Sequence, residues 1–393
     1  MKEPKLRFLA DDGSSFPDLK EKRLNDVCKY NKGQSIGVNY VGTENMKQDF
    51  SGVNDLDSEK EVKGVAYNIG DTLMSNIRPY LKKTWKADVN GVCSTDVLVF
   101  HPTDINSDYL YRSISSEKFI SYVMTAAKGS KMPRGDKEHI MNYDVQVPCL
   151  SEQQKIASLF TELDILIKSA EKELEGYREL KQGMLQKMFP KKGETVPEIR
   201  FPEFSGDWKQ SKLKEVTQII GGNAWKSSDY SENGEYLVVT IANVSGDKNI
   251  NDSIGNHISV NNTGTYLLNE GDILVSLTGN VGRVSRMTNT PALLNQRVGK
   301  MLPNEDRINP NFLFHVLRNS NFEKAMIEAG QGAAQKNISN NDVLNYAFYL
   351  PTKQEQHHIS AFLDELDSII EFQQQELDGY KELKKGLLQQ MFC

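Results

Sequence analysis

The sequence predicts an α+β protein in which two mixed α/β domains are separated by two long, antiparallel coiled-coil helices, in an approximately two-fold, circular arrangement. Residues 148–189 align without a gap to residues 351–392, and about 20 of the 42 pairs are identical. Both segments carry apolar residues at alternating steps of four and three, which is the 3.5-residue period of a left-handed coiled coil. The blocks before them, 1–147 and 191–350, resemble each other more weakly.

The chain therefore divides into four parts in alternation. We expect a first globular domain over 1–147, a first long helix within 148–190, a second globular domain over 191–350, and a C-terminal long helix within 351–393. If the C-terminus lies near the N-terminus, the two halves become nearly interchangeable. A single helix of this length spans about 57 Å, which is longer than a small domain. Two such helices with matching seams most simply pack on each other.

The helix seams are read directly from the apolar period. In the first helix the seam comprises Ile156, Phe160, Leu163, Ile167, Ala170, Leu174, Tyr177, Met184 and Met188. In the second helix it comprises Ile359, Leu363, Leu366, Ile370, Gln373, Leu377, Tyr380, Leu387 and Met391. Capping boxes are expected at Ser151-x-x-Gln154 and Thr352-x-x-Glu355, because each follows a proline and satisfies free backbone N–H groups. The apolar seam residues, and Tyr177 and Tyr380 above all, are also candidates for docking a partner protein.

The two globular blocks share short phrases. PKLRF at 4–8 is similar to PEIRF at 197–201, and GDTLMSNIR at 70–78 is similar to GDILVSLTG at 271–279. Alternating runs such as DVLVF at 96–100 and YLVVTIANV at 236–244 predict strands. A helical stretch is expected late in each block, near 107–127 and 310–329.

Composition narrows the class of protein. A length of 393 residues is too great for one ordinary core. No stretch approaches the roughly 20 apolar residues of a membrane helix, and the N-terminus lacks a signal-peptide core, so no membrane association is expected. The four cysteines form no Cys-x-x-Cys pair, which favours a reducing cytoplasm and predicts no metal site. The net charge of −6 argues on its face against nucleic acid, but residues 351–393 alone contribute −4.

Two similar but unequal blocks on a stiff spacer suit a ligand with two separated half-sites, and double-stranded DNA is such a ligand. The order of parts, the helix starts EQQKIASLF and EQHHISAFL, and the endings GYRELKQGMLQKMF and GYKELKKGLLQQMF resemble the specificity subunit of type I restriction–modification systems. The phrases YVGTENM, SNIRPYLKK and GGNAWKSSDYSENGEYLVVTIANV are similar to parts of that family's target-recognition domains. The resemblance covers essentially the whole chain.

The resemblance implies a function and a set of partners. It implies a subunit that is not itself a catalyst, uses no cofactor, and reads a bipartite asymmetric DNA target, one half per recognition domain. The paired helices would set the unread spacer. Two adenine-methylating subunits would dock on the two helical repeats and adjacent surfaces, and restriction subunits with translocase activity would join through that complex.

DNA contacts are expected from polar and basic side chains in loops, because phosphates and base edges need such donors and acceptors. In the first domain the candidates are Lys32, Gln34, Arg78, Tyr80, Lys82, Lys83, Lys131 and Arg134. In the second domain they are Lys226, Ser227, Ser228, Asn280, Arg283, Gln335, Lys336 and Asn337.

Two alternatives bear on these expectations, a methyltransferase and an assembly scaffold. Asn309-Pro310-Asn311-Phe312 is close to the Asn-Pro-Pro-Phe/Tyr motif of adenine methyltransferases, but it lacks the second proline and a glycine-rich cofactor loop. We expect it to begin a helix, with Asn309 as the cap. A self-sufficient methyltransferase is therefore disfavoured, and no catalytic residue is assigned. A pure assembly scaffold that brackets two proteins and reads no DNA stays open, since the same paired helices explain it.

Overall fold

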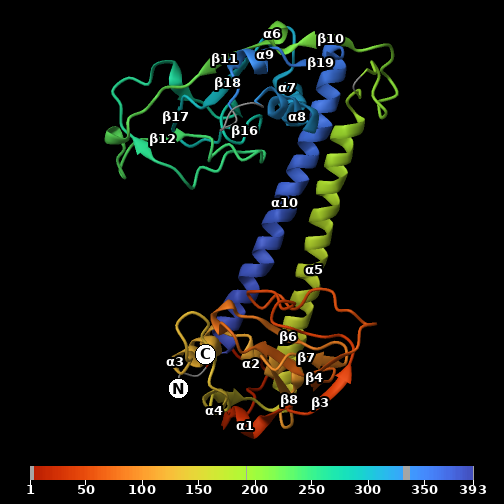
Figure 1. Ribbon diagram of the computed structural model, residues 1–393, viewed down its shortest axis with the longest axis vertical. Helices are drawn as coiled ribbons and strands as arrows, with labels where there is room; N and C mark the ends of the chain where they lie inside the picture. The colour runs from red at the N-terminus through yellow and green to blue at the C-terminus, as the bar shows by residue number, and fades with distance from the viewer. Residues whose placement is uncertain (1–3, 192, 331–336, 393) are drawn as a thin grey trace. The chain divides into compact units, whose positions relative to one another are not determined.

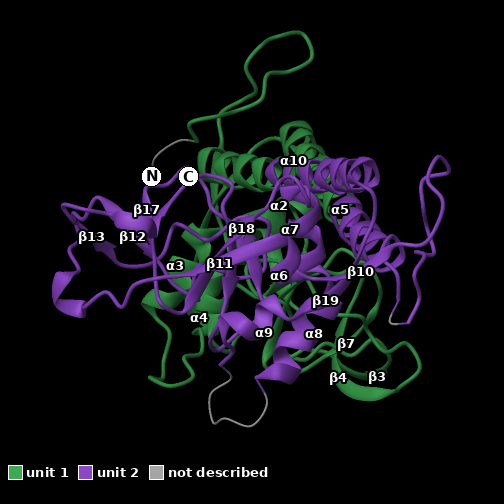
Figure 2. Cartoon of the chain, turned by 90° about the horizontal axis from the view of Figure 1, so that it is seen from above, with its two compact units in different colours: residues 1–171, 376–393 green, residues 172–375 purple. Residues whose placement is uncertain are grey.

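The computed structural model describes residues 4–191, 193–330 and 337–392, and the chain divides into two compact units (Figures 1 and 2). Unit 1 comprises residues 1–171 together with 376–393, and unit 2 comprises residues 172–375. Each unit contains one globular domain and a part of each long helix. The boundary between the units therefore crosses both helices rather than a loop.

The two long helices are α5 (Leu150–Lys187) and α10 (Lys353–Met391). The two helices run antiparallel. In the contacts between them, higher residue numbers on α5 pair with lower residue numbers on α10. In unit 1, Lys384 Nζ lies 2.6 Å from a carboxylate oxygen of Asp164. Lys381 Nζ lies 2.8 Å from a carboxylate oxygen of Glu171. The predicted antiparallel helix pair is thus confirmed.

The globular part of unit 1 is built on two main sheets and four short helices. One sheet has the order β2-β8-β5-β6 and the other the order β3-β4-β7, while β1 and β9 form a separate pair. All of these pairs are antiparallel. The strands are β1 Lys20–Arg23, β2 Cys28–Tyr30, β3 Gln34–Gly37, β4 Val62–Tyr67, β5 Thr72–Ser75, β6 Thr84–Lys86, β7 Gly91–Cys93, β8 Val97–Pro102 and β9 Asp144–Val147. The helices are α1 Leu24–Val27, α2 Ser107–Ile114, α3 Glu117–Thr125 and α4 Lys137–Met141, with the 3-10 helix η1 at Pro79–Leu81.

Unit 2 repeats one sheet and changes the other. The order β11-β18-β15-β16 matches β2-β8-β5-β6, and β10-β19 matches β1-β9. The remaining sheet, β13-β12-β17-β14, has four strands, and its β12–β17 pair is parallel. The strands are β10 Lys209–Lys212, β11 Thr217–Gly221, β12 Tyr236–Val239, β13 His257–Ile258, β14 Leu267–Leu268, β15 Ile273–Ser276, β16 Val284–Arg286, β17 Ala292–Leu294, β18 Val298–Pro303 and β19 Ala347–Leu350. The helices are α6 Leu213–Val216, α7 Pro310–Arg318, α8 Ser320–Ala329 and α9 Asn340–Leu344, with η2 at Ser227–Asp229 and η3 at Gly264–Tyr266.

The two units share one buried polar contact at the start of each long helix, in addition to the order of one sheet. Gln153, in the first turn of α5, accepts a hydrogen bond of 2.8 Å from the backbone N–H of Asn106, the N-cap of α2. Gln356, in the first turn of α10, accepts a hydrogen bond of the same length from the N–H of Asn309, the N-cap of α7. Both glutamines are buried, so these bonds fix the start of each long helix to the helix that precedes it. The identical glutamines of the repeat are explained by this shared task.

The C-terminal end of α10 packs into the core of the first domain, and the C-terminal end of α5 packs into the core of the second domain. In unit 1, Phe392 packs on Tyr109 with ring centroids 5.1 Å apart. In unit 2, Phe189 packs on Phe312 at 5.6 Å. The backbone N–H of Lys5 donates to the carbonyl of Gln390 at 2.9 Å, so the C-terminal turn lies beside the start of the chain. Each domain therefore needs residues from both long helices to complete its core.

Several local predictions are confirmed and others need correction. Strands form at 97–102 and 236–239, but the second predicted run ends early, because residues after Val239 form turns. The helical stretches near 107–127 and 310–329 are each two helices, since Ser116 and Asn319 cap a second helix within them. Asn309 caps α7, as expected.

The two predicted capping boxes differ in outcome. Thr352 Oγ1 accepts from the N–H of Glu355 at 3.3 Å, which confirms the first bond of the box at α10. The Glu355 carboxylate accepts from Arg200 and Trp208, so the reciprocal bond of the box is not confirmed. The box at Ser151 is wrong, because α5 begins at Leu150 and already includes this serine. No helix of the described residues is long and apolar enough to cross a membrane.

Candidate nucleic-acid interface

Two loops of the first domain bring most of its candidate DNA contacts together. The β5–β6 loop and the α3–α4 loop lie side by side, because the N–H of Arg78 donates to the carbonyl of Pro133 at 2.7 Å and Ile77 bridges Arg134. The candidates on these two loops are Arg78, Tyr80, Lys82, Lys83, Lys131 and Arg134. Loops separated by about 50 positions in the chain thus lie next to each other.

Three cations of these two loops are engaged within the domain. Lys82 Nζ lies 2.5 Å from a carboxylate oxygen of Glu117, and this hydrogen bond raises the pKa of Lys82. Lys83 Nζ donates to a backbone carbonyl. Arg134 pairs with Asp96 at 3.0 Å. These side chains shape the loops, while Tyr80 and Lys131 are exposed.

Lys32 and Gln34 lie elsewhere in the first domain. Gln34 begins β3, an edge strand of the three-stranded sheet, whereas the two loops above adjoin the four-stranded sheet. Both side chains are exposed. The structure does not bring them into contact with the loop surface.

The equivalent surface of the second domain is built on the β15–β16 loop. Thr278 Oγ1 donates to Asn337 Oδ1 at 2.9 Å, and the N–H of Ile338 donates to the carbonyl of Leu277. Asn280 is exposed at the tip of this loop. The Arg283 guanidinium lies 3.9 Å from a carboxylate oxygen of Glu323, which partly compensates the charge of the arginine. Two further candidates, Gln335 and Lys336, lie outside the described residues.

The remaining candidates of the second domain lie on the segment after β11. Trp225 Nε1 donates to the carbonyl of Leu294 at 3.1 Å and holds this segment against β17. Lys226, Ser227 and Ser228 follow it and are exposed around η2. Their side chains therefore project from an anchored segment.

Sequence reasoning missed a polar turn between β17 and β18. Gln296 and Arg297 are exposed there, and the N–H of Gln296 donates to the carbonyl of Asn223. The carbonyl of Arg297 accepts from the N–H of Leu277, so this turn adjoins the β15–β16 loop. The signal in the sequence was a polar triplet, Asn295 to Arg297, between two runs that are buried as strands.

The predicted helix seam is buried or half-buried throughout. The buried members are Ile156, Phe160, Leu163, Ala170, Leu174, Met188, Ile359, Leu363, Leu366, Leu377 and Met391. The half-buried members are Ile167, Tyr177, Met184, Ile370, Gln373, Tyr380 and Leu387. The first turns of each helix pack into a domain core, and only the middle turns form a seam between helices alone. The Oε1 atom of Gln373 is buried without a hydrogen-bond partner among the described residues.

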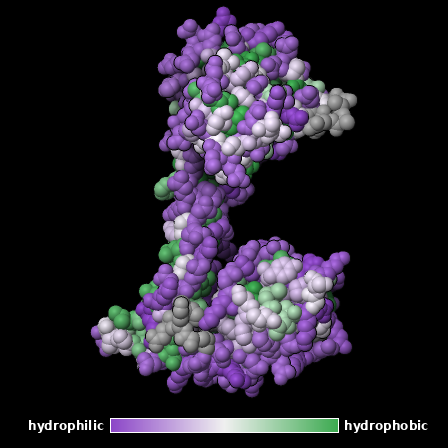
Figure 3. All heavy atoms as spheres, turned by 90° about the vertical axis from the view of Figure 1, so that its left-hand side faces the viewer, coloured by the Kyte–Doolittle hydropathy of each residue, from purple (hydrophilic) through white to green (hydrophobic). Residues whose placement is uncertain are grey.

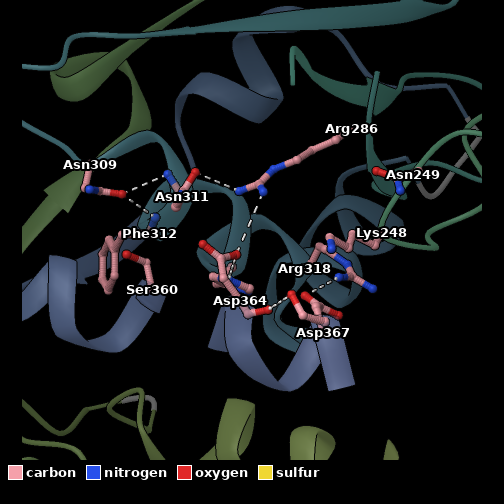
Figure 4. A network of polar contacts seen from close by, with 12 residues as sticks. Lys248, Asn249, Arg286, Asn309, Asn311, Phe312, Arg318, Ser360, Asp364 and Asp367 are labelled. Carbon is pink, nitrogen blue, oxygen red and sulfur yellow. Dashed lines mark hydrogen bonds and ion pairs between the residues drawn. The ribbon is translucent and has the colours of Figure 1, made fainter. Parts of the chain in front are cut away.

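A network of charges ties the second domain to the helices within unit 2 (Figure 4). It borders a groove of about 1000 Å³ that is lined by side chains of both signs. Asp367, which is buried, accepts from Lys181 and lies 3.4 Å from Arg318. Lys248, on the loop after β12, lies 2.7 Å from Glu371 of α10. Burial and the nearby Arg318 lower the pKa of Lys181 to about 8, although Asp367 opposes this shift.

One part of this network has the composition of a metal site. Ligand atoms of His315, Asp364 and Asp367 lie within 4.8 Å of one another. The carboxylates are already paired with cations, since Arg286 lies 3.8 Å from Asp364 and Asp367 holds the cations described above. Burial would raise the pKa of Asp364, but His315 and Arg286 hold it below its ordinary value. The arrangement is that of a compensated ion-pair cluster.

The methyltransferase-like motif has a structural role. The Asn309 side chain accepts hydrogen bonds from the N–H groups of Asn311 and Phe312, at 2.8 and 3.0 Å. Pro310 occupies the first turn of α7. Phe312 is fully buried under Phe189. The motif is therefore a helix start and part of the core.

The duplicated architecture can now be set beside known proteins. The sequence pattern described as the type I restriction modification DNA specificity domain matches residues 17–176 and again 205–380. The chain belongs to this family. It is accordingly a non-catalytic specificity subunit, and the two matches fall on the two halves of the chain.

Relatives and solved structures agree with this assignment. The type I restriction enzyme MjaVIII specificity subunit of Methanocaldococcus jannaschii is 26% identical over 94% of this chain and 91% of its own. The EcoDI specificity subunit of Escherichia coli is 28% identical over 33% of this chain. The S subunit of a type I system from M. genitalium shares the fold with a TM-score of 0.63, at 13% identity and covering 100% and 99% of the two chains. A structure from a study of type I system assembly and conformational transition gives 0.60, at 21% identity over 96% and 98%.

Proposed function

We propose that this specificity subunit reads a bipartite, asymmetric sequence in double-stranded DNA, with one half-site for each recognition domain. The domains are assigned to residues 1–147 and 191–350, and the helical segments to 148–190 and 351–393. The observation that carries the proposal is that one sheet is repeated in both units while the other differs in strand number and direction. A shared scaffold with unlike loops suits two unlike half-sites. The site of action that this implies is the cytoplasm.

The helix pair supports a fixed spacer between the half-sites. α5 has 38 residues and α10 has 39, and each is continuous through both units. A helix of that length spans about 57 Å at 1.5 Å per residue. At 3.4 Å per base pair, such a spacer covers at most roughly 17 base pairs.

We further propose that two methyltransferase subunits dock on equivalent surfaces of the two repeats, and that restriction subunits join through them. Leu180 of α5 and Leu383 of α10 are related by the 203-residue offset, and their exposed fractions are 41% and 50%. Each lies three residues after a half-buried tyrosine, Tyr177 or Tyr380. The two helices also expose Ile165, Leu166 and Phe372, and hydrophobic side chains are scattered over their otherwise hydrophilic surface (Figure 3). Isolated apolar residues at matching places are suited to two copies of one partner.

Docking is tested by single charge substitutions. Leu180→Glu and Leu383→Glu should each remove one methyltransferase subunit from the complex in native mass spectrometry, and the double variant should remove both. Because both leucines are exposed, the urea midpoint of the subunit should stay unchanged in these variants. Full two-to-one complexes with the double variant would contradict the proposed surface.

DNA reading is tested by exchanging a domain. The subunit is expressed with its methyltransferase in cells without other adenine methylation, and the methylated motif is determined by sequencing the DNA. Replacing residues 1–147 with the block of another family member should change one half-site and preserve the other. An unchanged motif would contradict the assignment of the first domain.

The scaffold alternative predicts a different outcome. It requires no salt-dependent affinity for DNA, whereas phosphate contacts make the logarithm of affinity fall steeply with the logarithm of salt concentration. Filter binding of the subunit–methyltransferase complex to DNA separates the DNA-reading subunit from the scaffold. It is measured between roughly 50 and 200 mM salt, the range over which such slopes are determined.

A further inference from the structure

Four of the five left-handed backbone conformations at described non-glycine residues gather at one place in the first domain. Among the described residues, positive φ angles outside glycine occur at Asn39, Asp49, Phe50, Arg78 and Lys82. The N–H of Asp49 donates to the carbonyl of Leu81, and the N–H of Phe50 to that of Lys82. The strained pair 49–50 therefore contacts the β5–β6 loop, which carries Arg78 and Lys82, whereas Asn39 contacts Asp57 and Asn90. Such conformations persist where the surrounding structure imposes them, and they cluster at functional sites.

The second domain has glycines at the corresponding positions. The β15–β16 loop is closed by the N–H of Ser276 donating to the carbonyl of Arg283, as Ser75 does with Lys83 in the first domain. Within that loop, Gly279 has a φ of 72° and Gly282 a φ of 80°. The loop therefore forms without side chains at these places, and glycine is the residue that the backbone favours.

Lys82 is accounted for by its ion pairs, but Arg78 is not. Lys82 lies 2.5 Å from Glu117 and 3.7 Å from Asp49. The guanidinium of Arg78 has no ion pair or hydrogen bond with any other described residue, and its Nε is buried without a partner. A strained backbone and an unsatisfied donor both destabilise the folded domain, and no contact among the described residues of the domain offsets them.

The backbone around Arg78 is held firmly. Its N–H donates to Pro133 at 2.7 Å, its carbonyl accepts from Leu81 at 2.9 Å, and Pro79 follows it directly. Lys131 is exposed on the adjoining loop. The backbone of Arg78 is thus fixed, its guanidinium donors are unoccupied, and a further basic group lies nearby. This arrangement suits bidentate recognition of the O6 and N7 atoms of guanine.

We propose that Arg78 reads a guanine in the half-site of the first domain, and that the second domain reads no base from the equivalent position, Gly279. This inference rests on the proposed function. It adds that the two domains read DNA differently although their β5–β6 and β15–β16 loops are closed by equivalent hydrogen bonds. The left-handed conformation aims the arginine, and its strain is retained because the side chain contributes to specificity.

Arg78→Gly separates reading from folding, because glycine suits the backbone and removes the guanidinium. The variant subunit is expressed with its methyltransferase, and the methylated motif is compared with that of the unchanged chain. Arg78→Gly should keep the second half-site and the spacer, and should lose at least about tenfold of discrimination at one G·C pair of the first half-site. Its urea midpoint should equal or exceed that of the unchanged protein. The matched control Asp49→Gly, also at a left-handed position and in contact with the same loop, should leave the motif unchanged.

Three results would overturn the inference. The first is an unchanged motif for Arg78→Gly. The second is a uniform loss of affinity for all sequences with the salt slope reduced by about one, which identifies a phosphate contact instead. The third is an equal loss of discrimination for Asp49→Gly, which identifies a general effect of loop flexibility. If the unchanged chain itself directs no sequence-specific methylation, the proposed function fails, and that result is distinct from these three.

Discussion

Two buried glutamates at the starts of the long helices offer a comparison between equivalent sites. Glu355 accepts two hydrogen bonds from Arg200, at 2.8 and 2.9 Å, and a third from Trp208 Nε1 at 3.2 Å. Glu152 accepts two from Arg7, at 3.1 and 2.6 Å. Both carboxylates are 1% exposed, but Arg200 is 14% exposed and Arg7 is 28% exposed. The site in unit 2 is therefore drier and holds one more donor.

Replacing each glutamate by alanine should cost unequal amounts of stability. Removing one partner of a buried ion pair costs about 3–5 kcal/mol, because it leaves a buried charge uncompensated. Arg200 keeps its bonds to two backbone carbonyls, at 2.6 and 3.2 Å, which places the loss near the lower end. The stranded Trp208 N–H adds about 1 kcal/mol, which gives about 4 kcal/mol for Glu355→Ala. Arg7 also keeps a bond to a backbone carbonyl, that of Pro17 at 2.7 Å. It is better hydrated than Arg200 and has no tryptophan beside it, so about 2 kcal/mol is expected for Glu152→Ala.

The measurement is hydrogen exchange with mass spectrometry over a urea series, since peptides from each unit report the opening of that unit separately. Glu355→Ala should lower the opening free energy of unit 2 by about twice the amount by which Glu152→Ala lowers that of unit 1. Adding Arg200→Met to Glu355→Ala should recover part of the loss, because no charge is then left unpaired. Equal losses in the two units, or no recovery in the double variant, would refute the reasoning.

Three further predictions address other parts of the chain. Burial lowers the pKa of His315 from its ordinary 6.5, so the unfolded chain takes up the proton first as pH falls. Unit 2 should then lose stability below about pH 6.5. In the same exchange measurement, His315→Gln should reduce this loss. Unit 1 has Arg112 at the related position and should show no such loss. Phe189→Ala should destabilise unit 2 by about 3–5 kcal/mol, and Phe392→Ala should destabilise unit 1 by less, because Phe392 is only half-buried; urea midpoints that are lowered equally would contradict this. Inserting one heptad into both long helices should lengthen the unread spacer by about 3 base pairs, since seven residues add about 10 Å; a methylated motif with its original spacing would contradict the proposed ruler.

The expectations about organisation came from patterns that local geometry imposes. A helix that buries one stripe needs apolar residues at a fixed period, so the two long helices and their seams are visible in the sequence alone. A duplicated contact needs the same residue twice, which is why Gln153 and Gln356 are identical in the repeat. Asn309 before Pro310 marked the start of α7 for a similar local reason.

Tertiary structure decided which side chains are available and which are already engaged. Lys82, Lys83 and Arg134 look equivalent to Arg78 in the sequence, yet only the fold brings Glu117 to the first and Asp96 to the last. Ion pairs between residues tens of positions apart leave no periodic trace, because they depend on how loops from different elements meet. The same holds for the left-handed backbone of Arg78, which its hydrogen bonds to Pro133 and Leu81 impose. The amino-acid sequence thus determined the scaffold and its duplication, whereas long-range packing determined which cations remain free to meet DNA.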